Sequence, residues 1–348
     1  MNTILFDNII YSLQRFGGIS SMWSMLLGGL CDNVSNLMFL EREDALNNIY
    51  RKNIELPCDK VVKSHSKFPL IIDRYRSVDT QNVNPSIFHS SYYRCVKDKD
   101  VKSVVTVHDF TYERYMARAQ RYIHCKQKYN AINNAEVVVC VSENTRKDLL
   151  HYLPNIEKDK IKVVYNGVSD VFCQLAGVAR GERLLYVGSR AKYKNFDFVV
   201  ETLSETSHHL DICGAPLSIK EQKFLNKKLG SERYKVYSNV DNHRLNELYN
   251  QAKCLIYPSD YEGFGMPIIE AQKTGCPVVA LNTSSVPEVI GATPLLLQSL
   301  SRKELLSALK MIETPTLFDN ISGLGMENAK KYTSQDAIDG YKEIYQSL

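Results

Sequence analysis

Short apolar runs alternate along the chain with longer stretches in which apolar residues recur at helical spacing. Apolar runs closed by Gly, Asn, Ser or Pro predict a first series of strands at 3–6, 87–90, 103–106, 137–141 and 162–164. A second series is predicted at 183–187, 209–213, 234–237, 254–257 and 277–281. Continuous apolar runs of this kind are typical of parallel strands buried on both faces. With helical stretches such as 245–252 between the runs, the pattern predicts an α/β architecture.

The alternation restarts near residue 182, after a loosely patterned segment. A chain of 348 residues also exceeds the roughly 250–300 residues at which single hydrophobic cores stop growing. We therefore expect two doubly wound domains, over residues 1–170 and 171–332. The remaining segment, 333–348, predicts a helix with an apolar stripe of Ile338, Tyr341, Ile344 and Tyr345.

Composition narrows the class of protein. Hydrophobic residues make up 44% and charged residues 24%, which is typical of a folded globular protein and not of a disordered one. No run approaches the roughly 20 apolar residues of a membrane span, and the amino-terminal segment does not resemble a signal peptide. The nine cysteines lack zinc-ligand spacing, and Cys140, Cys213 and Cys254 lie in apolar runs. These features predict a cytoplasmic protein with reduced cysteines.

The net charge of +4 resides in the first half of the chain. Residues 1–170 contain 23 Lys and Arg against 19 Asp and Glu, and the rest contains 20 of each. A mildly basic half favours phosphate-bearing partners or peripheral contact with the inner face of the cytoplasmic membrane. An ordinary solvated surface explains the same numbers. Nothing resembles a nucleic-acid-binding arm, so we expect no nucleic-acid partner.

The first candidate site follows the predicted strand at 254–257. Gly265 lies in the loop and Pro267 opens the next helix, where free N–H groups suit a phosphate or sugar hydroxyls. Glu262 and Glu270 are separated by seven residues and can reach opposite ends of an extended ligand, such as a sugar and a ribose. A plain strand–loop–helix connection with solvated glutamates would contain the same residues.

A second candidate site follows the strand at 183–187. Gly188 ends that strand, and Arg190 and Lys194 can reach a single anion. Two cations at this point can neutralise a departing diphosphate. A basic surface turn is the alternative interpretation.

Several further residues lie at the ends of predicted strands. Gly17 and Gly18 precede a predicted helix, and two glycines at such a point can approach a phosphate. The segment lacks the full G-x-G-x-x-G fingerprint of a nicotinamide site. His108 ends a strand and can donate a hydrogen bond to a ligand, and His89 is a weaker candidate on the acceptor side. Gly214 and Val240 lie in loops at the same kind of position. An ordinary structural role is the alternative for each of them.

The segment 258–278 resembles the E-x7-E signature of retaining glycosyltransferases of family 4, which have the GT-B fold. The residues that carry this resemblance are Pro258, Ser259, Glu262, Gly263, Phe264, Gly265, Pro267, Glu270, Ala271, Gly275, Pro277 and Val278. The resemblance implies two Rossmann-like domains facing a central cleft, with the final helix crossing back to the first domain. It spans nearly the whole chain and is weakest in 30–85 and 112–130, which we expect to carry acceptor recognition.

The resemblance also implies roles for individual residues. Arg190 and Lys194 would contact the diphosphate, while Glu262 and His108 would contact the transferred sugar. Glu270 would bind the ribose hydroxyls. The remaining donor contacts would come from Gly18, Gly214, Val240 and the backbone of Phe264, Gly265 and Met266.

The expected reaction is a retaining transfer of a hexose to a glycan or lipid-linked glycan of a surface polysaccharide, such as lipopolysaccharide. The donor would be a GDP-sugar or a UDP-sugar. GDP-mannose is the first choice, because several bacterial polysaccharide mannosyltransferases share the sequences Gly-Gly-Ile-Ser and Tyr-Lys-Asn-Phe. We expect no cofactor and no metal. Asp98-Lys99-Asp100 resembles the D-x-D metal signature of another fold, but it lies in a lysine-rich turn. The alternatives are a GT-B nucleotide-sugar epimerase and a non-catalytic nucleotide-sugar-binding module.

Overall fold

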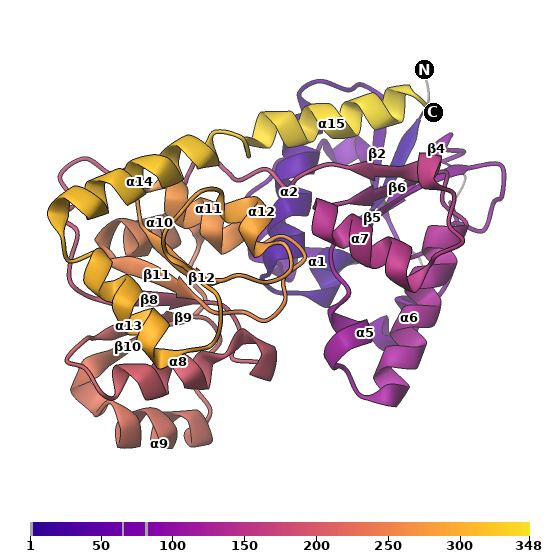
Figure 1. The fold of residues 1–348 in the computed structure, drawn as a ribbon. Coiled ribbons are helices and arrows are strands. Elements are labelled where there is room, and N and C mark those ends of the chain that lie inside the picture. The colour runs from indigo at the N-terminus through magenta and orange to yellow at the C-terminus, as the bar shows by residue number, and fades with distance from the viewer. Residues whose placement is uncertain (1–2, 65, 81–82) are drawn as a thin grey trace. The chain divides into compact units, whose positions relative to one another are not determined.

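The computed structural model describes residues 3–64, 66–80 and 83–348 (Figure 1). The chain divides into two compact units. Unit 1 comprises Met1–Gly167 together with Ser334–Leu348, and unit 2 comprises Val168–Thr333. Each unit contains its own sheet, and every strand pairing in both sheets is parallel. The α/β class expected from the apolar pattern is confirmed.

The sheet of unit 1 has the strand order β3-β2-β1-β4-β5-β6-β7. Its strands are β1 (Ile4–Asp7), β2 (Leu37–Glu41), β3 (Val61–Lys63), β4 (Ile87–Ser90), β5 (Lys102–Val107), β6 (Val137–Cys140) and β7 (Ile161–Val163). The order reverses between β1 and β4, and loops at such a reversal are where open α/β sheets bind ligands.

The α-helices of unit 1 connect these strands and close the unit. They are α1 (Ile10–Leu13), α2 (Gly18–Cys31), α3 (Ile49–Lys52), α4 (Leu70–Asp73), α5 (Thr111–Tyr115), α6 (Arg118–Asn133), α7 (Glu143–Tyr152) and α15 (Ser334–Gln346). The last of them, α15, packs against α2 (Figure 1). The apolar stripe predicted from the sequence is buried.

An aromatic cluster joins α2 and α15 to one face of this sheet. Phe6 is paired in register with Phe39 and with His89, so the three side chains share that face. Trp23 of α2 and Tyr345 of α15 meet the Phe6 ring edge-on, with centroids 5.7 and 5.8 Å away. Leu5, Leu40 and Phe88 form a separate core with Val78 and Val101.

The sheet of unit 2 has the order β10-β9-β8-β11-β12-β13 and reverses between β8 and β11. Its strands are β8 (Leu184–Val187), β9 (Leu210–Cys213), β10 (Tyr234–Tyr237), β11 (Cys254–Tyr257), β12 (Val278–Leu281) and β13 (Leu296–Leu297). Its α-helices are α8 (Phe196–Leu203), α9 (Ile219–Lys228), α10 (Asn242–Gln251), α11 (Met266–Lys273), α12 (Val286–Ile290), α13 (Arg302–Met311) and α14 (Pro315–Ala329).

All ten predicted strands are present, each within one residue of its predicted ends. Three strands were missed, namely β2, β3 and β13. All nine cysteines are free, and Cys140, Cys213 and Cys254 are buried as expected. Among the described residues, no helix is both long enough and apolar enough to cross a membrane.

Candidate functional site

The loops after β8 and β11 meet at the strand-order reversal of unit 2. Lys194 lies in the first loop and Glu262 in the second, and the Lys194 Nζ forms an ion pair with the Glu262 Oε1. The two side chains are only 14% and 12% exposed. Two charged residues predicted for the site on separate grounds are therefore direct partners.

Hydrogen bonds hold these two loops in a fixed relation. Asn195 takes a left-handed conformation (φ 52°), and its side-chain amide donates to the Asp260 Oδ1 over 2.7 Å. In return, the Asp260 N–H donates to the Tyr193 carbonyl over 2.8 Å. Since Tyr193 directly precedes Lys194, these bonds fix the position of the ammonium group.

Two serines after β12 form hydrogen bonds with the backbone around Glu262. The Glu262 N–H donates to the Ser284 Oγ over 2.9 Å. The Ser285 Oγ donates to the carbonyls of Glu262 and Phe264, over 3.0 and 2.9 Å. The Phe264 ring is buried and meets Tyr332 edge-on, so this side chain belongs to the core and its donor role rests on main-chain atoms.

Helix α11 begins directly after this loop. Gly265 precedes it with φ 100° and ψ 51°, in the left-handed region that favours glycine. Met266 is its first residue and Pro267 its second, where a missing N–H costs nothing. Pro267 has no N–H and the Ile268 N–H donates to the Gly265 carbonyl over 3.0 Å, so the positive end that suits an anion comes from the helix dipole and the Met266 N–H.

Glu270 lies inside α11 and is 8% exposed. The Tyr249 hydroxyl, from α10, donates to its Oε2 over 2.9 Å. Burial raises the pKa of Glu270 to about 7, and the hydrogen bond from Tyr249 opposes this rise. The carboxyl is consequently half protonated near neutral pH, and ligand hydroxyls that donate to it would favour the charged form.

Arg190, after β8, is anchored on the side of α9. Its Nε donates to the Glu221 Oε1 over 2.5 Å and its Nη2 to the Pro216 carbonyl over 2.9 Å. Arg190 holds the pKa of Glu221 down at about 2. The Nη1 is buried without a hydrogen-bond partner among the described residues, and a Cβ built on Gly214 would lie 3.4 Å from it. Within the described part of the chain, the guanidinium donors without a partner are the two N–H groups of the buried Nη1 and the second N–H of Nη2.

Gly214 directly follows β9, and Val240 lies in the loop after the neighbouring strand β10. A side chain at Gly214 would not fit, because its Cβ would lie 2.5 Å from the Gly188 carbonyl oxygen. Val240 is half-buried and precedes Asp241, which caps α10 by accepting the Arg244 N–H over 2.8 Å. The sheet order places the Gly214 loop beside the loop that carries Arg190, and the Val240 loop one strand further away.

Two predicted site residues belong to unit 1. His108 directly follows β5 and donates its backbone N–H to the Tyr93 hydroxyl over 3.5 Å. Burial lowers the pKa of His108 to about 4, so its imidazole is neutral at pH 7. Gly18 is the exposed first residue of α2, and a Cβ there would meet nothing within 4 Å.

The acceptor-side role suggested for His89 is wrong. The residue is fully buried, and both ring nitrogens have partners. Its Nδ1 lies 2.7 Å from the Tyr345 hydroxyl and its Nε2 lies 3.0 Å from the Thr106 Oγ1. Burial lowers its pKa to about 3, which keeps the ring neutral in the core. His89 therefore links the sheet to α15 through its hydrogen bond with Tyr345.

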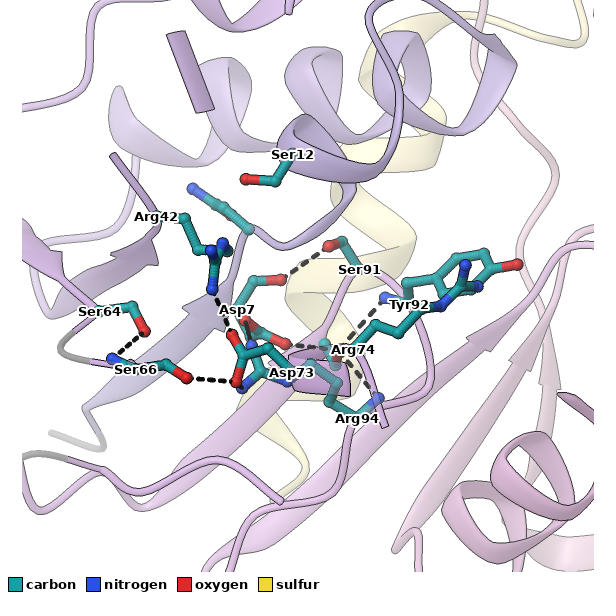
Figure 2. A network of polar contacts seen from close by, with 12 residues as sticks. Asp7, Ser12, Arg42, Ser64, Ser66, Asp73, Arg74, Ser91, Tyr92 and Arg94 are labelled. Carbon is teal, nitrogen blue, oxygen red and sulfur yellow. Dashed lines mark hydrogen bonds and ion pairs between the residues drawn. The ribbon is translucent and has the colours of Figure 1, made fainter. Parts of the chain in front are cut away.

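Sequence reasoning missed a buried polar network in unit 1, which Figure 2 shows. Asp7, at the end of β1, is 1% exposed and accepts from the Arg94 Nη1 over 3.1 Å. Asp73, also 1% exposed, accepts from the Arg42 Nη1 and the Ser66 Oγ, each over 2.7 Å. Burial raises the pKa of Asp7 in spite of Arg94 beside it. No sequence motif marks this network, because its members come from four separate segments.

No group of three or more metal-ligating side chains exists within residues 3–64, 66–80 and 83–348. Asp98 and Asp100 form a local turn, in which the Asp100 N–H donates to the Asp98 Oδ1 over 3.0 Å.

Two family models match the chain, one after the other. Residues 48–171 match the model described as Glycosyltransferase Family 4, and residues 174–313 match the model described as Glycosyl transferases group 1. An uncharacterized 41.2 kDa protein in the cps region of Klebsiella pneumoniae is 24% identical over 275 residues, covering 73% of this chain and 74% of that protein. The O-antigen chain mannosyltransferase B of Escherichia coli is 28% identical over 255 residues, covering 64% of this chain and 66% of that protein.

Solved structures share the fold over the full chain. Sucrose-phosphate synthase from Thermosynechococcus elongatus has a TM-score of 0.80 at 16% identity, covering 100% of this chain and 99% of that one. Anabaena Alr3699/HepE in complex with UDP-glucose has a TM-score of 0.77 at 16% identity, covering 100% of both chains. At such identities the likeness shows the fold, which is GT-B, and the fold expectation is confirmed.

Proposed function

Since the chain belongs to the glycosyltransferases of the family 4 type with the GT-B fold, we propose that it transfers a hexose from a nucleoside diphosphate sugar. Mannose is the first choice of sugar, and a glycan or lipid-linked glycan of a surface polysaccharide is the proposed acceptor. The O-antigen mannosyltransferase among the relatives supports mannose. The neighbour structure with bound UDP-glucose supports a nucleotide-sugar donor, and UDP is the second choice of nucleotide after GDP.

The observation that carries the proposal is the Lys194–Glu262 ion pair at the start of α11. A lysine ammonium has three N–H donors, so two remain after one bond to Glu262. These two donors and the positive end of α11 favour negative charge, and the Arg190 guanidinium belongs to the same loop as Lys194. Such a group stabilises a leaving diphosphate, on which charge accumulates as the glycosidic bond breaks.

The proposed reaction retains the anomeric configuration. The acceptor hydroxyl oxygen forms a bond to the anomeric carbon on the face that the diphosphate leaves. The electron pair of the broken bond goes to the diphosphate oxygen, and the acceptor proton goes to the same group. Glu262 orients the sugar and Glu270 binds the ribose hydroxyls. The other donor contacts stay predictions. They involve His108, Gly18, Gly214 and Val240, and the main chain of Phe264, Gly265 and Met266.

The proposed transfer uses neither a metal nor a cofactor, because the cations and the helix start already supply positive charge. Turnover in excess EDTA is expected to equal turnover without it. A loss of turnover on chelation that Mg²⁺ restores would overturn this part of the proposal.

A donor panel distinguishes the proposal from its two alternatives. The full chain is incubated with GDP-mannose, UDP-glucose and related donors, with and without a polyprenyl-diphosphate-linked glycan, while nucleoside diphosphate release is followed. Acceptor-dependent release supports the transferase. An epimerase would convert the donor without acceptor, and a binding module would raise its melting temperature with donor but never release product.

A further inference from the structure

Unit 1 exposes large apolar side chains in two segments of its surface. The first comprises α4 and its flanking loops, with Phe68, Ile71, Ile72 and Tyr75 exposed by 42%, 75%, 49% and 42%. The second comprises α5 and α6, with Tyr115, Tyr122 and Ile123 exposed by 42%, 68% and 52%. Scattered exposed apolar residues need no explanation, but a concentration of this kind marks an interaction site.

The two segments lie side by side. The Gln127 side chain of α6 donates to the Arg74 carbonyl, next to α4. The Arg74 guanidinium lies 4.9 Å from the centroid of the Tyr92 ring, and that ring lies 5.7 Å from the His124 ring of α6. We call the surface formed by residues 66–76 and 111–128 the α4–α6 surface.

The charge of the α4–α6 surface has one sign. Its two segments contain eight Lys and Arg residues, of which Lys128 is buried, and two carboxylates, Asp73 and Glu113. Both carboxylates are buried and paired, Asp73 with the Arg42 Nη1 over 2.7 Å and Glu113 with the Lys128 Nζ over 2.6 Å. The charged groups that this surface exposes are therefore cations, which alternate with protruding apolar side chains.

The buried polar network fixes α4 in this orientation (Figure 2). Asp73, the last residue of α4, is held by Arg42, Ser66 and Arg94, the last through an Nη2 that lies 3.7 Å from its Oδ1. Turning Ile71 and Ile72 inward would break these contacts and leave a buried carboxylate unpaired. The exposure of the isoleucines is thus built into the fold.

A cavity of about 640 Å³ opens on the same surface. Arg118, Arg121 and Lys126 line it together with Tyr122 and Tyr129. One carboxylate also lines it, that of Glu113, which is paired with Lys128. Guanidinium and ammonium groups beside phenol rings suit a phosphate at the boundary between water and apolar matter, because arginine, lysine and tyrosine all combine an apolar body with a polar tip.

We propose that the α4–α6 surface docks onto an anionic lipid bilayer. The isoleucines and aromatic rings would enter the interface, and the surrounding cations would contact lipid phosphates. A bilayer matches both features, since it offers an apolar layer directly beneath a sheet of negative charge. The proposal concerns the location of the protein and does not rest on the identity of its donor or acceptor.

Vesicle co-sedimentation of the full chain tests this proposal. Phosphatidylcholine vesicles with about one third phosphatidylglycerol should bind the protein at least roughly tenfold more tightly than pure phosphatidylcholine, and added salt should weaken binding. The variant I71D/I123D removes the apolar contacts and R118E/R121E reverses two charges. Each is expected to lose about tenfold or more in affinity.

The matched control is I219D, in α9 of unit 2, where the isoleucine is also 75% exposed. It should bind vesicles like the wild type, and circular dichroism should show that all variants are folded. Equal affinity for both vesicle types, no binding to either, or unchanged binding by I71D/I123D overturns the proposal. It is also overturned if light scattering shows a wild-type dimer that I71D/I123D dissociates, because a second copy would then cover the surface.

Discussion

Lys194 and Glu262 form an ion pair that joins the loops after the adjacent strands β8 and β11. The lysine is predicted to hold the diphosphate and the glutamate to face the sugar. Each charge neutralises the other, and the ion pair holds both side chains in place. This arrangement limits the reorganisation that the reaction requires.

Replacing Lys194 with alanine is expected to reduce kcat by about 10²–10³, the usual effect of removing one preorganised donor to developing charge. Nucleoside diphosphate release measures the effect, and the matched control is K192A, since Lys192 is exposed two residues earlier. K194A leaves the Glu262 carboxylate without its partner, which should lower the free energy of unfolding. The double variant K194A/E262Q should recover that free energy, because no unpaired carboxylate remains, but it should not recover turnover. Near-normal turnover of K194A would contradict the diphosphate role.

Glu221 is expected to act as a positioning residue for Arg190. Because the Glu221 carboxylate accepts from the Arg190 Nε, E221A should lower kcat/KM for the donor about tenfold, and kcat should fall with it. The double variant R190A/E221A should be no worse than R190A, which gives a coupling energy of about 1–3 kcal/mol in a double-mutant cycle. Additive effects would show that the two residues act independently, and E232A serves as an exposed control.

Glu270 should make stability fall as pH rises. Its pKa is about 7 in the folded protein against 4.5 for a solvated glutamate, so the native state binds the extra proton. The favourable contribution is complete below pH 4.5 and is lost as pH rises through about 7. The variant E270Q lacks this titration and should gain up to about 3 kcal/mol over the wild type by about pH 8. Urea unfolding at several pH values measures the difference, and parallel curves for the two proteins would refute the assignment.

His89 should contribute to stability and not to donor binding. H89A removes a buried ring and its bonds to Tyr345 and Thr106, and should cost about 3–5 kcal/mol of unfolding free energy. Y345F removes one bond only and should cost about 1 kcal/mol. If H89A were as stable as the wild type, the docking role of His89 would be wrong.

The strands of both units could be predicted from the sequence because each is a short apolar run between turn residues. The missed strands have weaker signals: β3 spans only Val61–Lys63 and β13 only Leu296–Leu297. The remaining one, β2, ends directly in the charged run Glu41-Arg42-Glu43-Asp44. Strand identity there depends on pairing with β1, which is a tertiary property.

Pairings between distant residues could not be predicted. A histidine at a strand end suggests a ligand contact, and only the fold shows that the His89 ring points into the core beneath Tyr345. In the same way, the Arg42–Asp73 and Arg94–Asp7 pairs join residues far apart in the chain. By contrast, Glu262 and Glu270 belong to one continuous motif, so the sequence alone located them.

The most direct test of the central claim is the structure of the glycoside formed from GDP-mannose and a polyprenyl-diphosphate-linked glycan by the full chain. Product analysis by NMR should show one added hexose with the anomeric configuration of the donor, together with one released nucleoside diphosphate for each transfer. The product should disappear with K194A and persist with K192A. Inverted configuration would contradict the retaining mechanism, and conversion of the donor without any transfer, across the donor panel, would contradict the proposed function itself.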